Sequence, residues 1–228
     1  SFNVQGCLPE EALSYLNGNN PFLIDLRERY SEFDQRVTDP LLWTSDLIRD
    51  EDILYFRGDN PYVYQLRGQN MNAISYALAF YYLQSIDNLG LLSKLEEDDS
   101  FGNFTFQINE KLISRDLLDS INEIYFLERY LHLSSDNKKF NILDIGAGYG
   151  RLAHRMVLAC SSVENYLCTD AIPESTFISD YYLQYRNIQA RAKAVPLDEI
   201  TEQLKCHNID LAINIHSFSE CTVSAIEW

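Results

Sequence analysis

The stretch that decides the fold is KFNILDIGAGYGRLAHRM, residues Lys139 to Met156. The short apolar run 140–145 is typical of a buried strand, and three glycines follow it directly. Gly146 permits a sharp turn, Gly148 lets a ligand approach the backbone, and Gly150 allows a helix to begin close to the strand. The free N–H groups at the start of that helix attract an anionic group. The pattern therefore predicts a strand–turn–helix unit that holds a small ligand.

Strand and helix patterns alternate along the chain after this unit. Further strand candidates are residues 165–170, 188–195 and 209–215, and helical patterns lie between them. This alternation predicts an α/β fold with a doubly wound, Rossmann-like parallel sheet and right-handed crossovers. Residues 135–228 supply only four strands, whereas such sheets usually have about six. We therefore expect the core to be incomplete at its C-terminal end in this chain.

The first part of the chain has a different texture. Residues 1–134 are rich in Tyr and Phe and are predicted to be mainly helical, with residues 71–86 as the strongest buried helix. A second helix is indicated where Leu117, Ile121, Ile124 and Leu131 recur at helical spacing. Residues 101–109 alternate between apolar and polar types, which favours a short strand or hairpin arm. We expect this region to serve as a lid, a substrate-binding part or a dimer surface.

The charge balance narrows the classes of partner. The chain has 34 acidic and 18 basic residues and a net charge of −16, so nucleic acid and anionic membranes are both unfavourable partners. Neither a membrane-spanning run nor a signal peptide is indicated. Five scattered cysteines without a C-x-x-C pair favour a reduced, cytoplasmic protein. The sequence shows no convincing set of metal ligands.

The residues around the glycines indicate which ligand is bound. A dinucleotide fingerprint would place its third glycine at position 151, where this chain has Arg151. Asp144 would repel a pyrophosphate but suits a ligand with an ammonium group. Asp170 ends the second strand about twenty residues after the turn, where a carboxylate accepts hydrogen bonds from ribose hydroxyls; the alternative is a helix cap or turn residue. S-adenosylmethionine, with an amino group, a ribose and no phosphate, is favoured over NAD.

The segments LDIGAGYG and CTD resemble motif I and the second-strand acid of class I S-adenosylmethionine-dependent methyltransferases. The resemblance covers residues 138–228. It implies a set of cofactor-binding residues, which in this sequence are Asp144, Gly146, Ala147, Gly148, Gly150, Asp170 and Asn214. It also implies that the adenine lies near residues 195–198, which match only loosely.

Two further segments narrow the resemblance. YFRGDNPYVYQLRGQN (residues 55–70) and INIHSFSEC (residues 213–221) look like segments of a bacterial family of sugar O-methyltransferases. The acceptor implied is a hydroxyl of a sugar or glycoconjugate. Arg57, Asp59 and Tyr64 are then candidates for substrate binding. The alternative is a structural loop in which Arg57 and Asp59 pair locally.

Methyl transfer to a hydroxyl is assisted by a base that takes the hydroxyl proton. His216 follows the fourth strand, beside the expected ligand crevice, and is the candidate general base; the alternative is a histidine that only bonds its own loop. Glu220 and Asn214 are candidates to orient the ring or the substrate, or else caps of the turn. The other three histidines are predicted to lie on the surface; they are His132, His154 and His207.

The sequence is compatible with three functions. The first is an O-methyltransferase that uses S-adenosylmethionine and a small-molecule or carbohydrate acceptor. The second is an NAD-binding oxidoreductase or epimerase, against which Arg151 argues. The third is a non-catalytic, methyltransferase-like binding module. A homodimer would be favoured if the aromatic stripes of the helical region proved to be exposed.

Overall fold

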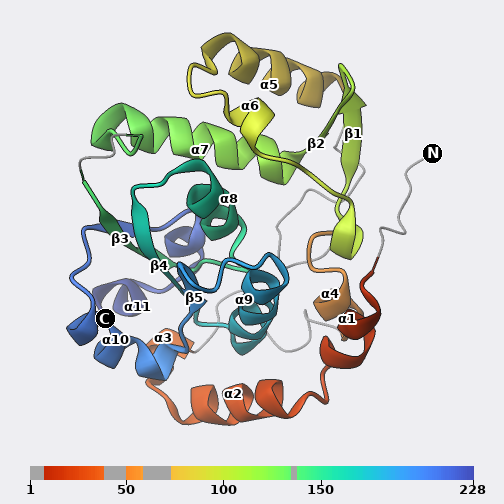
Figure 1. Cartoon of the computed structure of the whole chain (residues 1–228). Coiled ribbons are helices and arrows are strands. Elements are labelled where there is room, and N and C mark those ends of the chain that lie inside the picture. The colour runs from red at the N-terminus through yellow and green to blue at the C-terminus, as the bar shows by residue number, and fades with distance from the viewer. Residues whose placement is uncertain (1–7, 39–49, 59–72, 135–137) are drawn as a thin grey trace.

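The computed structural model describes residues 8–38, 50–58, 73–134 and 138–228. They form an α/β structure around a four-stranded parallel sheet, with a small antiparallel hairpin to one side (Figure 1). The strands of the sheet are β3 (Phe140–Ile145), β4 (Val163–Thr169), β5 (Ala192–Ala194) and β6 (Leu211–Ile213). Each lies within or beside a segment predicted from the sequence, although the last two are shorter than expected.

The order of the sheet is β5-β4-β3-β6, with every pair parallel. The chain first steps outward from β3 to β5 and then returns to add β6 on the other side of β3. This is the order of the first four strands of a doubly wound sheet, so the fold is compatible with a Rossmann-like one. The direction reverses between β3 and β6. Ligands bind at such reversal points, outside the carboxyl ends of the strands.

Helices and short 3₁₀ segments connect these strands or follow the last of them. They are α8 (Arg151–Ala159), α9 (Pro173–Tyr185), η3 (Leu197–Glu199), α10 (Ile200–Cys206), η4 (Ser217–Glu220) and α11 (Val223–Glu227). Pro173 is the first residue of α9, where its missing N–H costs nothing because that position has no partner within the helix. The predicted helix starts after the glycine turn and at Pro173 are both confirmed.

The first part of the described chain is mainly helical, as expected. Its elements are α1 (Glu10–Tyr15), α2 (Pro21–Glu32), α3 (Gln35–Thr38), α4 (Asp50–Leu54), α5 (Ala73–Ile86), α6 (Leu91–Lys94), η2 (Ser100–Gly102), β1 (Thr105–Ile108), β2 (Lys111–Ser114) and α7 (Arg115–Leu131). The predicted hairpin arm is β1, which pairs with β2. Asn109 and Glu110 between them both have positive φ, 50° and 64°, as a tight hairpin turn requires.

The helical region and the sheet pack together through three apolar clusters. In β3, Ile142 faces a large apolar cluster that includes residues of α5, α6, α7 and α8, whereas Leu143 faces a smaller cluster with Ile200 of α10. Alternate residues of a strand point to opposite faces, so β3 is covered on both sides. A third cluster joins α1, α2 and α4 to α9. In Figure 1, α5–α7 therefore lie at one end of the molecule and α2 at the other.

Two expectations about burial are wrong. The helix predicted over residues 71–86 is described from Ala73, but only one face of it is buried, and Ile74 and Leu78 are 72% and 67% exposed. His154, expected at the surface, is buried, with its Nδ1 3.1 Å from the Tyr182 hydroxyl. Burial lowers the pKa of His154 to about 2, so this ring stays neutral. Within the described residues, no helix combines the length and apolar character that crossing a bilayer requires.

Candidate functional site

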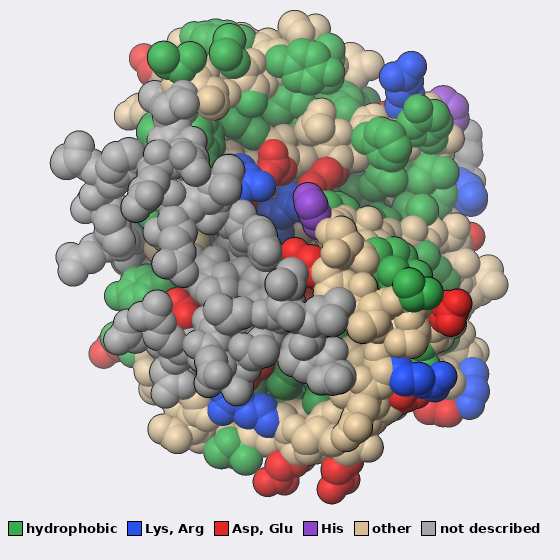
Figure 2. All heavy atoms as spheres, turned by 180° about the vertical axis from the view of Figure 1, so that it is seen from behind, with side chains coloured by type: hydrophobic (Ala, Val, Ile, Leu, Met, Phe, Trp, Pro, Cys, Tyr) green, Lys and Arg blue, Asp and Glu red, His purple; other side chains and the backbone are tan. Residues whose placement is uncertain are grey.

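A cavity of about 720 Å³ opens at the carboxyl ends of β3, β4 and β6. Its wall is formed by the glycine turn after β3, the end of β4, the loop after β6, α11 and one face of α7. Figure 2 shows a hollow on the back of the molecule where acidic, basic and histidine side chains meet. The volume is within the range of sites that bind small molecules and cofactors.

The glycine turn has the backbone form that the sequence predicted. Gly146, Gly148 and Gly150 all have positive φ, at 73°, 57° and 83°. A Cβ on Gly146 would lie 2.0 Å from Oγ of Ser217, which donates a hydrogen bond to the Gly146 carbonyl at 3.1 Å. A side chain at position 146 is therefore excluded twice, by backbone strain and by contact with the loop after β6.

Gly150 is needed for a different reason from the one expected. A Cβ there would lie 3.0 Å from Oγ of Ser179 and 3.2 Å from Cδ2 of Leu183, both on α9. The close neighbour is thus the next helix along the chain and not the strand. Sequence spacing identified the small residue but not its neighbour, because α9 is brought there only by tertiary packing.

Asp170 follows β4 and connects it to the glycine turn. One carboxylate oxygen accepts from the N–H of Gly148 and the other from the N–H of Ile172, both at 3.0 Å. The pKa of Asp170 is raised to about 6, chiefly because the carboxylate is removed from water. The two N–H groups lower the pKa, and the nearby charge of Glu220 raises it. Asp170 therefore does act as a turn residue, which was the alternative prediction for it. The same carboxylate also lines the cavity.

Asp144 is the second carboxylate of the cavity floor, and it is 4% exposed. The hydroxyl of Tyr166 donates a hydrogen bond to it at 2.8 Å. Burial raises the pKa of Asp144 to about 7, although this hydrogen bond from Tyr166 lowers it. A cationic group placed beside Asp144 would recover part of the energy lost on burial, whereas a phosphate would add repulsion.

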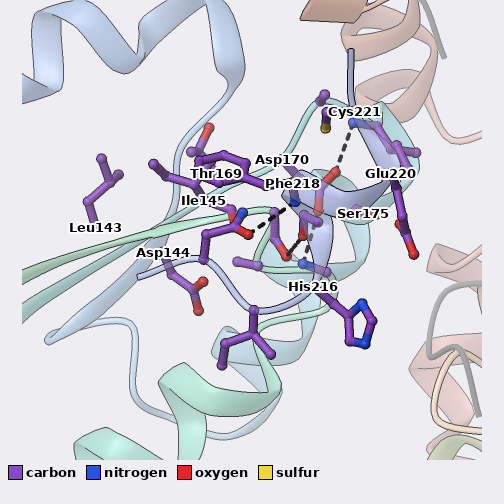
Figure 3. A pocket seen from close by; sticks show the side chains of 18 of the residues that line it. Leu143, Asp144, Ile145, Thr169, Asp170, Ser175, His216, Phe218, Glu220 and Cys221 are labelled. Atoms are coloured by element: carbon purple, nitrogen blue, oxygen red, sulfur yellow. Dashed lines mark hydrogen bonds between the residues drawn. The ribbon is translucent and has the colours of Figure 1, made fainter. Parts of the chain in front are cut away.

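His216 stands at the mouth of the cavity with its ring exposed (Figure 3). Its backbone has φ 73° and ψ −32°, a strained combination for a residue with a Cβ. Oγ of Ser219 donates its proton to the His216 carbonyl at 2.6 Å and lies 3.2 Å from Nδ1 of the ring. Because a hydroxyl has one proton, Nδ1 must carry its own hydrogen and donate to Oγ. Nε2 is then the nitrogen with a free lone pair, as a general base requires.

Asn214 and Glu220 hold different places in the same loop. The Asn214 amide donates to the carbonyl of Ile145 at 2.7 Å and accepts from the N–H of Phe218 at 3.1 Å. It therefore fixes the loop after β6 against the end of β3. Glu220 lines the cavity, and Figure 3 shows its carboxylate on the same side as the His216 ring. Of the two, Glu220 is the side chain placed to meet a ligand.

α7 contributes a wall of the cavity that was not predicted from the sequence. Its carboxylates lie at spacings of three and four residues on one face of the helix and are Asp116, Asp119 and Glu123. Arg115 pairs with Asp119 at 3.0 Å, and Arg151 makes two bonds of 2.8 Å to Glu123. The hydroxyl of Tyr149, in the glycine turn, donates to Asp116. The three acids at i, i+3 and i+7 were the signal available, since such residues share a helix face.

Of the three predicted substrate-binding residues, the structure describes only Arg57. Arg57 is fully buried and donates to Glu97 and Asp98, each at 2.6 Å, so its guanidinium is occupied within the protein. It is absent from the cavity wall, which corrects the expectation that it binds a sugar. Asp59 and Tyr64 lie outside the described residues, as does the alternative pairing of Arg57 with Asp59.

Of the residues predicted near an adenine, only Leu197 lines the cavity. Val195 packs in the core beneath the sheet, and Asp198 accepts two hydrogen bonds of 2.8 Å from Arg29 of α2. Ala147, expected among the cofactor residues, lines the cavity beside Gly148. Among the residues that the structure describes, no group of three or more metal-ligating side chains comes together.

The chain was compared with protein-family models, with curated proteins and with solved structures. None of the three comparisons gives a significant match.

Proposed function

We propose that the chain is an S-adenosylmethionine-dependent O-methyltransferase, with its cofactor in the cavity at the end of β3. The observation that carries this proposal is the pair of carboxylates, Asp144 and Asp170, on either side of a positive-φ glycine turn. Asp170 is at the end of the strand next to the turn, the place of a ribose-binding acid in doubly wound sheets.

The charge of the cavity favours this cofactor over a dinucleotide. Six acidic side chains line the cavity; they are Asp116, Asp119, Glu123, Asp144, Asp170 and Glu220. The basic ones are Arg115 and Arg151, and each already pairs with a carboxylate of α7. Within the described wall, a pyrophosphate would meet no uncommitted cation, whereas a sulfonium or ammonium group would be attracted.

The residues of the chain have distinct roles in this proposal. When bound, S-adenosylmethionine supplies an electrophilic methyl group. Nε2 of His216 takes the proton of the acceptor hydroxyl, and Ser219 holds the ring in the required tautomer. Glu220 binds the acceptor or stabilises the protonated imidazole. The paired side chains on α7 offer planar donors and acceptors for acceptor hydroxyls, a role expected earlier of Arg57.

The acceptor class rests on the resemblance of residues 213–221 to sugar O-methyltransferases. A sugar or glycoconjugate hydroxyl fits a polar cavity wall, because each hydroxyl both donates and accepts hydrogen bonds. The non-catalytic module remains the second candidate, and the exposure of His216 in this structure is the observation that favours it.

Calorimetric titration with S-adenosylmethionine, S-adenosylhomocysteine and NAD tests the cofactor. We expect the first two to bind and NAD to bind at least about 100-fold more weakly, a difference of about 2.7 kcal/mol. Binding of NAD alone would overturn the proposal. If the first two bind but no hydroxyl acceptor is methylated in a screen of sugars, the binding-module function replaces the enzymatic one.

A further inference from the structure

The outer face of α5 is unusual for a helix at the surface. Tyr76, Phe80 and Leu83 face the core, as the inner stripe of an amphipathic helix would. The opposite face is also apolar and consists of Ile74, Leu78, Tyr82 and Ile86, which are 72%, 67%, 58% and 37% exposed. The helix has no charged residue over its whole length of 14 residues. A helix that is apolar all round is normally buried on all sides.

Tyr81 adds to this surface, because it is 48% exposed on the same helix. Figure 2 shows hydrophobic side chains gathered at the top of the molecule, where Figure 1 places α5. Together the five exposed side chains of α5 present roughly 560 Å², taking about 200 Å² for each when free. That is at the upper end of the largest apolar patches of typical monomers, and two such faces bury roughly 1,100 Å², above the about 1,000 Å² expected of a biological interface.

We propose that two copies of this chain form a symmetric dimer through this surface, with α5 packed against α5. Positions 74, 78, 82 and 86 form a ridge with a spacing of four residues, about 18 Å long at 1.5 Å per residue. Ridges with this spacing interdigitate with an identical ridge at a crossing angle of about −50°. The face is thus complementary to itself, as a two-fold interface requires.

The charge of the chain limits where a second copy can dock. At a net charge of −16, two copies repel one another except where they meet through an uncharged surface, and α5 supplies one. A basic partner would instead be drawn to the acidic faces. The cavity lies at the carboxyl end of the sheet and does not include α5, so the dimer leaves the proposed active site open.

Sedimentation velocity of the full chain over about 1–100 μM tests the proposal, a range that covers micromolar interfaces of standard size. We expect a dimer whose dissociation constant falls as salt is added, because screening weakens the repulsion between two acidic copies. The double variant Leu78→Glu/Tyr82→Glu places four carboxylates at the interface and should raise the dissociation constant at least about 100-fold. Leu13→Glu, at a leucine of α1 that is 58% exposed, is the matched control and should leave it unchanged.

Two further measurements keep the result unambiguous. Circular dichroism checks that each variant folds, and Leu78→Gln, which adds no charge, should weaken the dimer less than the double glutamate variant. A chain that stays monomeric at every concentration overturns the proposal. So does a dimer that the α5 variants leave intact, or a monomer that floats with vesicles of neutral phosphatidylcholine, since the face would then be a membrane contact.

Discussion

The carboxylate of Asp170 accepts a hydrogen bond from the backbone N–H of Gly148, with 3.0 Å between oxygen and nitrogen. This contact ties the end of β4 to the middle of the glycine turn after β3. The same carboxylate faces the cavity, so the geometry of the turn and the recognition of a ligand depend on one side chain.

Asp170→Asn tests this double dependence. An amide oriented to accept from Ile172 presents its NH₂ group to the N–H of Gly148, so two donors face each other. We expect the affinity for S-adenosylmethionine to fall by about 10- to 100-fold, equivalent to about 1.4–2.7 kcal/mol. Titration calorimetry measures it. Asp198→Asn, which removes a carboxylate bonded to Arg29 outside the cavity wall, serves as the control and should bind normally.

Gly146→Ala tests the contact between the glycine turn and the loop after β6. The new methyl group would overlap Oγ of Ser217 at 2.0 Å, so the loop that carries His216 must move. Gly90→Ala is a matched control, since Gly90 has a similar φ of 67° and no atom within 4 Å of the added Cβ. In both variants the backbone strain should lower the free energy of unfolding by about 1–2 kcal/mol. Only Gly146→Ala should lose stability beyond that and also lose cofactor binding; equal losses in both variants would contradict the predicted contact.

His216→Ala separates the enzyme from the binding module. We expect S-adenosylmethionine to bind as before, and methyl transfer to slow by about 10²- to 10⁴-fold, the usual contribution of a general base. Ser219→Ala, which frees the ring to adopt either tautomer, should give a smaller loss in kcat. Single-turnover rates with radiolabelled methyl measure both. Full activity in His216→Ala would remove the histidine from the mechanism.

Asp144 makes the stability of the fold depend on pH. Its pKa is raised from 3.8 to about 7 in the folded chain, so the folded state binds more protons than the unfolded state between these values. The stabilisation is complete below about pH 4 and is lost as the pH rises to about 7. In the wild-type chain, Asp144 should lower the free energy of unfolding by roughly 2–4 kcal/mol between pH 4 and pH 8. Asp144→Asn should abolish this decrease, which urea titrations across the pH range measure. An unchanged pH dependence would mean that the pKa of Asp144 does not differ between the folded and unfolded chain. Asp25→Asn, at an exposed carboxylate, is the control.

Arg57→Ala tests the structural role that replaces the predicted sugar contact. Arg57 and Arg155 both donate to the buried Glu97, at 2.6 Å and 2.8 Å, so removing Arg57 leaves a carboxylate short of a partner. We expect a loss of about 3–5 kcal/mol in the free energy of unfolding. Arg36→Ala, at an exposed arginine, should change stability little. Weaker acceptor binding at full stability would instead restore the role in substrate binding.

Local sequence patterns predicted the parts of the fold that depend on neighbouring residues. The strand 140–145 and the helix after Gly150 follow from an apolar run, glycines and helical spacing, which act over a few residues. The parallel sheet followed from the alternation of such units. Burial was predicted less well: α5 is apolar enough for the core, yet no element among the described residues covers its outer face.

The sequence by itself determined the α/β class, the glycine turn and the positions of Asp144 and Asp170, because each of these is set by order along the chain. Only the tertiary structure decided that Ser217 closes on Gly146, that α7 supplies the acidic wall, and that Arg57 is buried against Glu97 and Asp98. These contacts join residues about 30 to 70 positions apart. Such contacts depend on how complete helices and strands pack together, and no local pattern records that packing.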